Sequence, residues 1–162
     1  MKYLPAIVLF GLLLGLSACS KNDITDRTIN IVGVYEGDVA LYLDTDSTRD
    51  FTNQRVEIRK VDDNRVQILM LEYPDESPAD TLEFFAELTP TPLGFIRTKG
   101  VLLTIGSTSY AEGVVKGVPY LGAAGGLDEH GLHDEESGEL VFALEVLING
   151  VNNFELFQGR KQ

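Results

Sequence analysis

The side chains best suited to metal binding or catalysis lie close together in the sequence, in the segment from Asp128 to Glu136. His130 and His133 are three positions apart, and Asp134 follows directly, so this segment holds imidazole and carboxylate groups suited to a divalent metal ion. In an irregular loop, however, this spacing does not align the two rings as a helix would. The sequence therefore leaves two interpretations, a metal site formed by His130, His133 and Asp134 or a hydrated acidic loop.

No other part of the sequence carries the pattern of a catalytic centre. The chain lacks a G-x-S-x-G nucleophile motif, a P-loop and a dinucleotide-binding fingerprint. Its single cysteine, Cys19, excludes a disulfide framework and a zinc site built on cysteines of one chain. Glu83 and Glu87 point the same way on a strand, which indicates a solvated face rather than an acid and a base across a cleft. We therefore predict a protein that is not an enzyme and uses no cofactor.

The composition limits both the fold and the partners. The chain has 162 residues, of which 44% are hydrophobic, and these values are typical of a single globular domain. It carries 25 acidic and 13 basic residues, so its formal net charge is -12. Because nucleic-acid phosphates attract basic proteins, this balance argues against a nucleic-acid partner.

The first residues have the layout of a secretory signal. A basic start at Lys2 precedes an apolar run from Leu4 to Leu16, and polar residues follow from Ser20. A transmembrane helix needs about 20 apolar residues, so this run is too short to span a membrane. We expect the segment to direct export and then to be removed.

The end of this segment, Leu16-Ser17-Ala18-Cys19, resembles the lipobox of bacterial lipoproteins. The resemblance implies cleavage after Ala18, attachment of a diacylglyceryl group to the Cys19 thiol, and acylation of the new amino terminus by a fatty acid such as palmitate. Two or three acyl chains hold a protein on a membrane, whereas one chain anchors it only marginally. The implied division is a lipoprotein signal peptide at 1–18, a lipidated amino terminus with a flexible tether at 19–30, and a folded domain at 31–162.

The implied location is the bacterial cell envelope, with the lipid anchor in the outer membrane. Lipoproteins exported to the surface of Bacteroidota tend to carry an acidic run after the cysteine, but Ser20-Lys21-Asn22-Asp23 pairs one acid with one lysine. We therefore expect the periplasmic side, and the outer surface stays the alternative. The sequence indicates no particular protein partner.

From residue 31 onward, hydrophobic and polar residues alternate with the two-residue period of β-strands, and no helical period is found. Leu82, Phe84 and Ala86, for example, alternate with Glu83 and Glu87. The predicted strands cover 34–43, 51–61, 65–73, 82–89, 94–105, 110–116, 140–148 and 154–158. Because mostly short turns join them, we predict an all-β fold, an eight-stranded antiparallel up-and-down β-barrel, with a two-sheet sandwich as the alternative.

Two segments are expected to depart from this regular pattern. The stretch from Gly117 to Glu139 is rich in glycine and acidic residues, and we expect an exposed, mobile loop over the open end of the barrel. Asn149-Gly150 is typical of a two-residue hairpin, but that turn would point Phe154 and Leu156 away from the core. Because burial favours the opposite register, we predict a loop of three or five residues there.

The first and last predicted strands carry a second resemblance. Gly33-Val34-Tyr35 opens the first strand, and Gly159-Arg160-Lys161 follows the last. Together with the eight strands, these motifs are similar to the lipocalin-like, or calycin-like, barrel domains of secreted Bacteroidota lipoproteins. The resemblance implies that Tyr35 replaces the tryptophan of the lipocalin G-x-W motif and that Arg160 covers it, closing one end of the barrel.

A barrel of eight strands is just wide enough either to fill with side chains or to hold one small ligand. Charges on the outward strand faces argue against a barrel that spans the membrane. The apolar side chains expected on the inner faces are the candidate ligand-binding residues, namely Tyr35, Val39, Leu41, Ile58, Phe84, Leu144 and Val146. Two functions stay open: a membrane-anchored carrier or sensor of a small hydrophobic ligand, or a non-enzymatic scaffold or interaction subunit of the cell envelope with a packed barrel.

Overall fold

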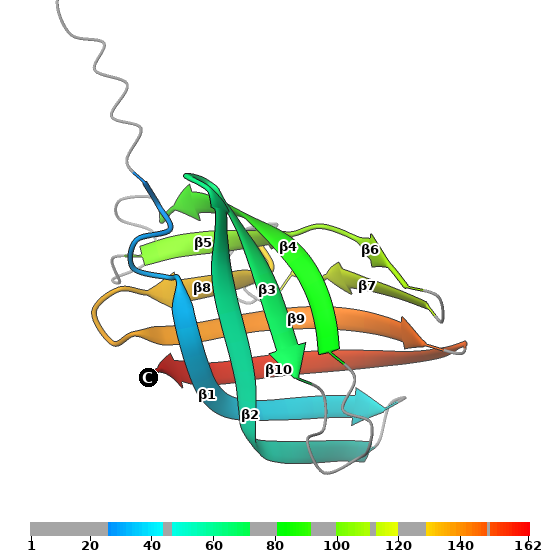
Figure 1. Cartoon of the computed structure of the whole chain (residues 1–162). Coiled ribbons are helices and arrows are strands. Elements are labelled where there is room, and N and C mark those ends of the chain that lie inside the picture. Colours follow the sequence, from blue (N-terminus) through cyan, green and yellow to red (C-terminus); the bar gives the residue numbers. More distant parts are fainter. Residues whose placement is uncertain are drawn as a thin grey trace, which may run out of the picture.

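A computed structural model of the chain describes residues 26–43, 47–71, 81–91, 100–110, 113–119, 129–148 and 150–162. These residues form strands and turns, and no helix occurs among them. The strands are β1 Gly33–Leu43, β2 Ser47–Asp62, β3 Arg65–Leu71, β4 Thr81–Pro90, β5 Gly100–Ile105, β6 Thr108–Ser109, β7 Gly113–Gly117, β8 Gly131–Asp134, β9 Glu139–Ile148 and β10 Val151–Lys161. They curve around a common interior (Figure 1).

The sheet closes on itself. Antiparallel pairs connect β10, β1, β2, β3, β4, β5, β8 and β9 in that order, and β9 pairs with β10 to complete the ring. The predicted eight-stranded antiparallel β-barrel is therefore confirmed. Two further strands extend it, because β7 pairs with the remaining part of β9 and β6 pairs with β7.

One position in the barrel wall is shared by β7 and β8. Both strands pair with the same edge of β9, β7 with its second half and β8 with its first. Ala143 of β9 lies between the two pairings and bonds to the residues that flank β7 and β8. Its carbonyl accepts a hydrogen bond from Val118 N–H at 3.2 Å, and its own N–H donates to His130 O at 2.9 Å. β7 and β8 therefore behave as one strand interrupted by an insertion.

The prediction of an exposed loop over 117–139 is wrong in its second half. β8 lies in the wall between β5 and β9, where Val101 and Leu140 pair with His133 on either side. Gly131 and His133 are buried. These residues belong to the barrel itself, so they cannot act as a mobile flap over its end.

The predicted alternation of inward and outward side chains is confirmed in β3 and β4, whereas Gly100 to Leu103 of β5 are all buried. In β4, Leu82, Phe84, Ala86 and Leu88 are at most 4% exposed. On β2, Val56 and Ile58 are buried, whereas Arg55 and Arg59 face solvent. In β2 and β4, the two-residue period therefore produces an apolar inner face and an outer face that carries charged side chains.

The β9–β10 hairpin has a two-residue turn, although we predicted a longer loop. Val151 pairs directly with Ile148, so only residues 149–150 connect the strands. Gly150 has a φ of 80°, a left-handed conformation that two-residue hairpins require and that glycine adopts at little cost. The predicted loop of three or five residues is therefore wrong, because turn geometry and not apolar burial sets this register.

This register also decides which side chains of β10 face inward. Glu155 and Phe157 pair with the buried Leu144 and Phe142 of β9, so they share the inner face. Phe154 and Leu156 consequently point outward. The Phe154 ring packs at the outer surface against Tyr42, with ring centroids 5.5 Å apart.

Residues 26–32 lie across one end of the barrel, which we call the N-terminal end. Figure 1 shows this blue segment beside the turns that join β2 to β3 and β8 to β9. Arg27 holds it in place, because its Nη1 donates to Leu88 O and its backbone N–H donates to Asp63 O, both at 3.0 Å. Residues 26–30, which we expected in the flexible tether, are therefore part of the folded domain.

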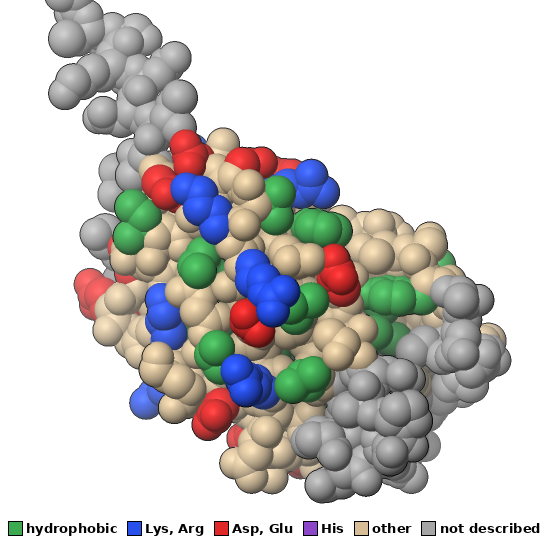
Figure 2. All heavy atoms as spheres, viewed as in Figure 1, with side chains coloured by type: hydrophobic (Ala, Val, Ile, Leu, Met, Phe, Trp, Pro, Cys, Tyr) green, Lys and Arg blue, Asp and Glu red, His purple; other side chains and the backbone are tan. Residues whose placement is uncertain are grey.

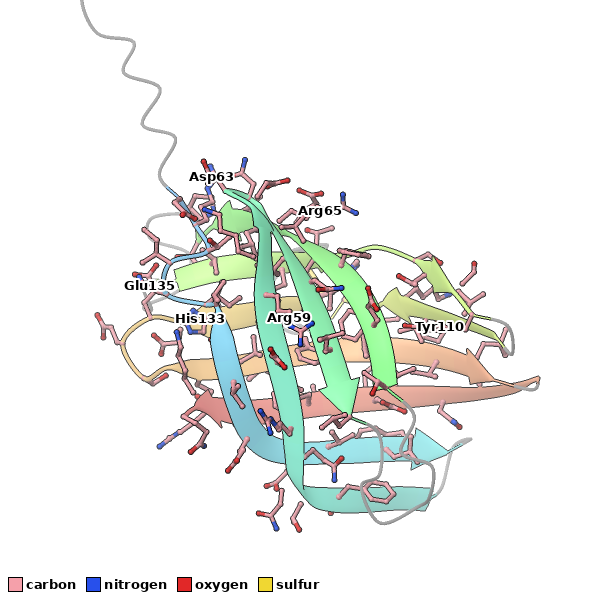
Figure 3. All side chains as sticks on the ribbon, in the orientation of Figure 1. Arg59, Asp63, Arg65, Tyr110, His133 and Glu135 are labelled. Carbon is pink, nitrogen blue, oxygen red and sulfur yellow. The ribbon has the colours of Figure 1, made fainter. Side chains whose placement is uncertain are left out.

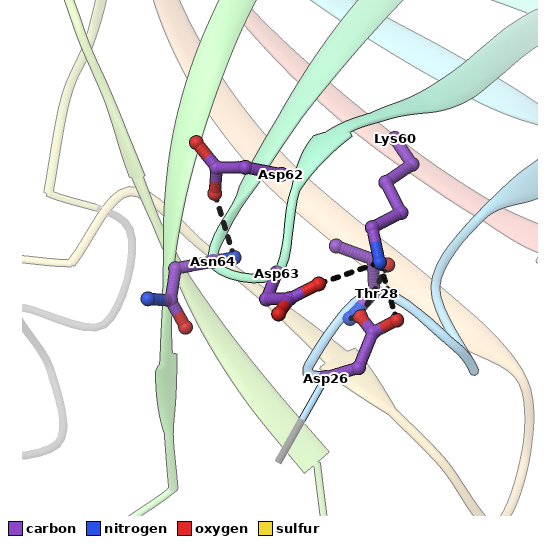
Figure 4. Close-up of polar contacts among 6 residues, drawn as sticks. All are labelled: Asp26, Thr28, Lys60, Asp62, Asp63 and Asn64. Atoms are coloured by element: carbon purple, nitrogen blue, oxygen red, sulfur yellow. Dashed lines mark hydrogen bonds and ion pairs between the residues drawn. The ribbon is translucent and has the colours of Figure 1, made fainter. Parts of the chain in front are cut away.

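A small polar cluster fixes the start of this segment (Figure 4). Lys60 Nζ contacts the carboxylates of both Asp26 and Asp63. Asp26 also accepts hydrogen bonds from the backbone N–H and the hydroxyl of Thr28. The hydrogen bonds from Lys60 and Thr28 lower the pKa of Asp26 to about 2, so this carboxylate is ionised near neutral pH.

Candidate functional site

The seven residues predicted to line the barrel all face its interior. None of them is more than 5% exposed: Tyr35, Val39, Leu41, Ile58, Phe84, Leu144 and Val146. They do not form a single group, however, because the strands carry them to different levels. Tyr35 and Leu41 are six residues apart on β1, which separates them by roughly 20 Å along the strand. Tyr35 and Leu41 therefore lie near opposite ends of the interior.

A layer of aromatic rings separates the two ends. Phe142 stacks on Phe157 with ring centroids 5.1 Å apart, and Phe84 meets Phe142 edge-on at 5.7 Å. In the wall, β5 and β8 lie between β4 and β9, so the contact between Phe84 and Phe142 crosses the interior. All three rings are fully buried. The barrel is therefore packed at this level.

The opposite end, which we call the hairpin end, contains the β9–β10 turn and the last residue of β1, Leu43, which pairs with Asn153. Two polar side chains of β10 face inward here. Glu155 is 2% exposed and lies in register between Leu41 and Leu144. Asn153 faces the same way, and its buried Oδ1 has no hydrogen-bond partner among the described residues.

Most buried side chains among the described residues are apolar, and Glu155 is one of four buried polar ones, with Thr28, Gln54 and His133. Moving a carboxylate from water into apolar surroundings costs several kcal/mol unless other groups compensate. A carboxylate and an amide oxygen are both hydrogen-bond acceptors, so together they suit a group that presents N–H or O–H donors. The aliphatic side chains of Leu41, Leu144 and Val146 lie on the same inner face and suit a hydrocarbon. The hairpin end can therefore recognise an amphipathic molecule.

At the N-terminal end, Tyr35 is fully buried and its hydroxyl donates to Ile31 O at 2.7 Å. Burial raises the pKa of Tyr35, which keeps this hydroxyl protonated. The resemblance placed Tyr35 at a closed barrel end, and the structure places it there through its bond to the N-terminal segment.

His133 packs edge-on against Tyr35, with ring centroids 5.9 Å apart, and is 1% exposed (Figure 3). Neither of its ring nitrogens has a hydrogen-bond partner among the described residues. Burial lowers the pKa of His133, Lys161 lowers it further, and Glu135 and Asp134 oppose this shift. The imidazole is therefore neutral at neutral pH.

Arg160 does not cover Tyr35, so this prediction is wrong. Its side chain is exposed, and its backbone pairs with Glu36 on the outer face. Lys161, one residue later, is the residue in register with Tyr35, and its Nζ donates to Asn30 O at 2.8 Å. Because successive side chains on a strand point to opposite faces, Arg160 and Lys161 lie on opposite faces of the sheet.

The structure does not bring His130, His133 and Asp134 together. His133 lies in the interior, whereas His130 Nδ1 accepts a hydrogen bond from Ile105 N–H at 2.8 Å. Asp134 accepts two hydrogen bonds from the turn at residues 136–137. Within the described ranges, no group of three His, Cys, Asp or Glu side chains could hold a metal ion.

His130 instead has a structural position at the break between β7 and β8. Its backbone N–H donates to Leu103 O at 2.8 Å, and its ring accepts from Ile105 N–H, so it binds two successive sites on β5. The ring occupies space beside Gly117, where any Cβ atom would overlap Nδ1. His130 therefore satisfies backbone groups of β5 at the break between β7 and β8.

Glu155 was not among the predicted site residues, because the opposite register was expected for β10. The dipeptide Asn149-Gly150 could have identified it, because the two-residue turn that this dipeptide favours places Glu155 opposite Leu144. Asn153 was missed for the same reason, because the same turn sets it opposite Val146.

The predicted lipid-attachment residue, Cys19, lies outside the described residues. In the part of the chain that the structure describes, no helix has the length and hydrophobicity needed to cross a membrane. No protein-family model matches the chain, and neither a curated protein nor a solved structure matches it.

Proposed function

We propose that the protein is a lipid-anchored, non-enzymatic binding protein of the bacterial cell envelope that holds a small amphipathic molecule inside its barrel, at the hairpin end. The observation that carries this proposal is the buried Glu155, which faces inward beside Asn153. The ligand class is a hydrocarbon that bears an amine or hydroxyl group. This is more specific than the neutral hydrophobic molecule expected from the sequence, because the interior offers acceptors.

The packing around these residues supports the proposed orientation. The aromatic layer of Phe84, Phe142 and Phe157 forms the floor below the site. The donor group of the ligand binds Glu155 and Asn153, and its hydrocarbon contacts the aliphatic side chains beside them. An anionic head is disfavoured, since a carboxylate repels it in a poorly hydrated interior. Barrel mouths with a few polar groups in an apolar lining are common ligand sites.

The lipobox-like motif supports the anchoring part of the proposal. Acyl chains on Cys19 would hold the barrel at a membrane surface, where molecules with hydrocarbon chains are concentrated. Asp26, the first residue that the structure describes, packs in the folded domain and is close in sequence to this cysteine. The tether between the anchor and the barrel would therefore be short.

The test uses the full chain with Cys19→Ala, which removes acyl chains that would compete for the site. Uptake of the fluorescent probe N-phenyl-1-naphthylamine is measured first, and then its displacement by decylamine, decanol and decanoate. We expect decylamine to displace the probe best and decanoate least. Glu155→Gln should weaken decylamine at least tenfold, because it removes a charge-assisted hydrogen bond.

The matched control is Glu36→Gln, which removes an exposed carboxylate from the outer face of β1. It should leave the displacement by decylamine unchanged. Equal losses in the two variants would show that overall charge, and not the interior site, attracts the amine. Equal displacement by decylamine and decanoate in the wild-type chain would also contradict the proposal.

A second candidate function is a scaffold whose barrel is packed throughout. The contact between Phe84 and Phe142 across the interior favours it. Phe84→Ala removes this contact and creates space in the interior. Probe uptake by Phe84→Ala but not by the wild-type chain would support the packed scaffold and contradict the carrier.

A further inference from the structure

The outer face of the barrel contains a hollow of about 320 Å³ over β2, β3 and the start of β4. Figure 2 shows this face, where basic, acidic and hydrophobic side chains lie close together. The lining residues are Arg55, Glu57, Arg59, Leu69, Leu71 and Thr81. The hollow lies on the outside of the wall, so it is distinct from the interior site at Glu155.

Among the described residues that line the hollow, Arg59 and Glu57 form an ion pair and Arg55 is the remaining cation. Arg59 Nε donates to Glu57 Oε1 at 2.9 Å, and this hydrogen bond lowers the pKa of Glu57, so the two side chains form an ion pair. Arg55 forms no ion pair or hydrogen bond with any other described residue. The three charged groups therefore sum to one positive charge, on a chain whose formal net charge is -12.

The remaining lining is apolar with one hydroxyl. Leu69 and Leu71 follow the same face of β3 and are half-buried. Leu69 pairs with Glu57, and Leu71 pairs with Thr81, so the leucines lie between the charged strand β2 and the hydroxyl on β4. An occupant would meet a guanidinium on one side, hydrocarbon beneath it and a hydroxyl on the other side.

We propose that this hollow binds a small organic carboxylate with a short aliphatic chain. A guanidinium presents parallel N–H donors that match the two oxygens of a carboxylate, which identifies Arg55 as the main contact. Leu69 and Leu71 contact the aliphatic chain, and the Thr81 hydroxyl donates to the carboxylate. The single positive charge matches a monoanion better than a phosphate dianion. The volume lies at the lower limit for small-molecule sites, which fits a chain of a few carbons.

Hexanoate is a suitable probe, with hexylamine, hexanol and inorganic phosphate for comparison. The full chain with Cys19→Ala is titrated with each compound while the methyl resonances of Leu69 and Leu71 are followed by NMR. We expect hexanoate to shift these resonances in a saturable way, and the other compounds to bind at least tenfold more weakly. Arg55→Gln should weaken hexanoate at least tenfold.

Arg65→Gln is the matched control. Arg65 lies on the same outer face but outside the hollow, over the Phe85 ring and 3.7 Å from Glu87 (Figure 3). This variant should bind hexanoate as the wild-type chain does. Equal weakening by Arg55→Gln and Arg65→Gln would overturn the proposal, because surface charge alone would then explain binding. Tighter binding of phosphate than of hexanoate would overturn the assignment to carboxylates.

Glu155→Gln separates this site from the interior one. It should leave the shifts of Leu69 and Leu71 unchanged, because Glu155 lies inside the barrel. Hexanoate binding that improves in Glu155→Gln, without shifts at Leu69 and Leu71, would place the carboxylate in the interior and overturn the outer site.

Discussion

Acidification below about pH 6.5 should destabilise the barrel through His133. This side chain is 1% exposed, and burial lowers its pKa below the ordinary value of 6.5. The unfolded chain therefore takes up a proton at a higher pH than the folded chain does. The contribution of neutral His133 to stability is complete above pH 6.5 and is lost as the pH falls towards its folded-state pKa.

The size of the effect follows from proton linkage. One proton taken up only by the unfolded state changes the free energy of unfolding by at most about 1.4 kcal/mol per pH unit. Because Tyr35 and the surrounding core exclude water from the ring, little of this value is lost to solvent screening. Between pH 7 and pH 5.5, we therefore expect a loss of about 1 kcal/mol.

Urea unfolding of the full chain at pH 7, 6.5, 6 and 5.5 measures this loss. His133→Leu should remove most of it, since leucine does not titrate. His130→Asn leaves His133 as the only histidine and should keep the loss. A wild-type free energy of unfolding that does not change over this range would refute the reasoning, as would an unchanged pH dependence in His133→Leu.

Four other substitutions test the structure at separate places. His130→Ala should lower the free energy of unfolding by about 1–3 kcal/mol, because it removes the acceptor for Ile105 N–H, and His130→Asn should lose less by keeping an acceptor; equal losses would argue against this role. Tyr35→Phe should cost about 1 kcal/mol in urea unfolding, and no change would mean that the bond to Ile31 contributes nothing. Asp26→Asn should lower the melting temperature more at pH 5 than at pH 2, because the pKa of Asp26 is about 2 in the folded chain and 3.8 in the unfolded chain, so the stabilisation is complete above pH 3.8 and is lost as the pH falls through 2. Cys19→Ala should move the protein from the membrane fraction to the soluble fraction, and wild-type protein that is soluble with an unmodified Cys19 by mass spectrometry would contradict lipidation.

Seven of the eight strands in the ring could be predicted because most of them carry a clear two-residue period, whereas the predicted strand at 110–116 corresponds to β7, which lies outside the ring. In β4, apolar residues occupy every inward position from Leu82 to Leu88, so the buried face can be read without any tertiary information. On β2, the charged residues Arg55, Glu57 and Arg59 occupy alternate positions and mark the outward face of the strand. Local pattern and global fold agree here, which is what makes such strands predictable.

The strand β8 could not be predicted in the same way. It has only four residues, and its inward positions are Gly131 and His133, neither of which is strongly apolar. Its place in the wall depends on neighbours that are distant in sequence, since it pairs with β5 on one side and β9 on the other. The predicted metal site failed for this reason, because β8 carries His133 into the core, whereas the His130 ring binds the backbone of β5 and Asp134 binds the turn at residues 136–137.

The candidate site exists because turn chemistry and apolar burial conflict in β10. Burial alone favours Phe154 and Leu156 inside, where each would gain about 1.5–3 kcal/mol over full exposure. The two-residue turn at Gly150 imposes the opposite register, which buries Glu155 and keeps Phe157 in the aromatic layer. A sequence that places an ionisable group in the core against the burial pattern is locally inconsistent, and such inconsistencies tend to concentrate at functional positions. Glu155 is an ionisable side chain buried in this way, and the proposed carrier function assigns it the donor group of the ligand.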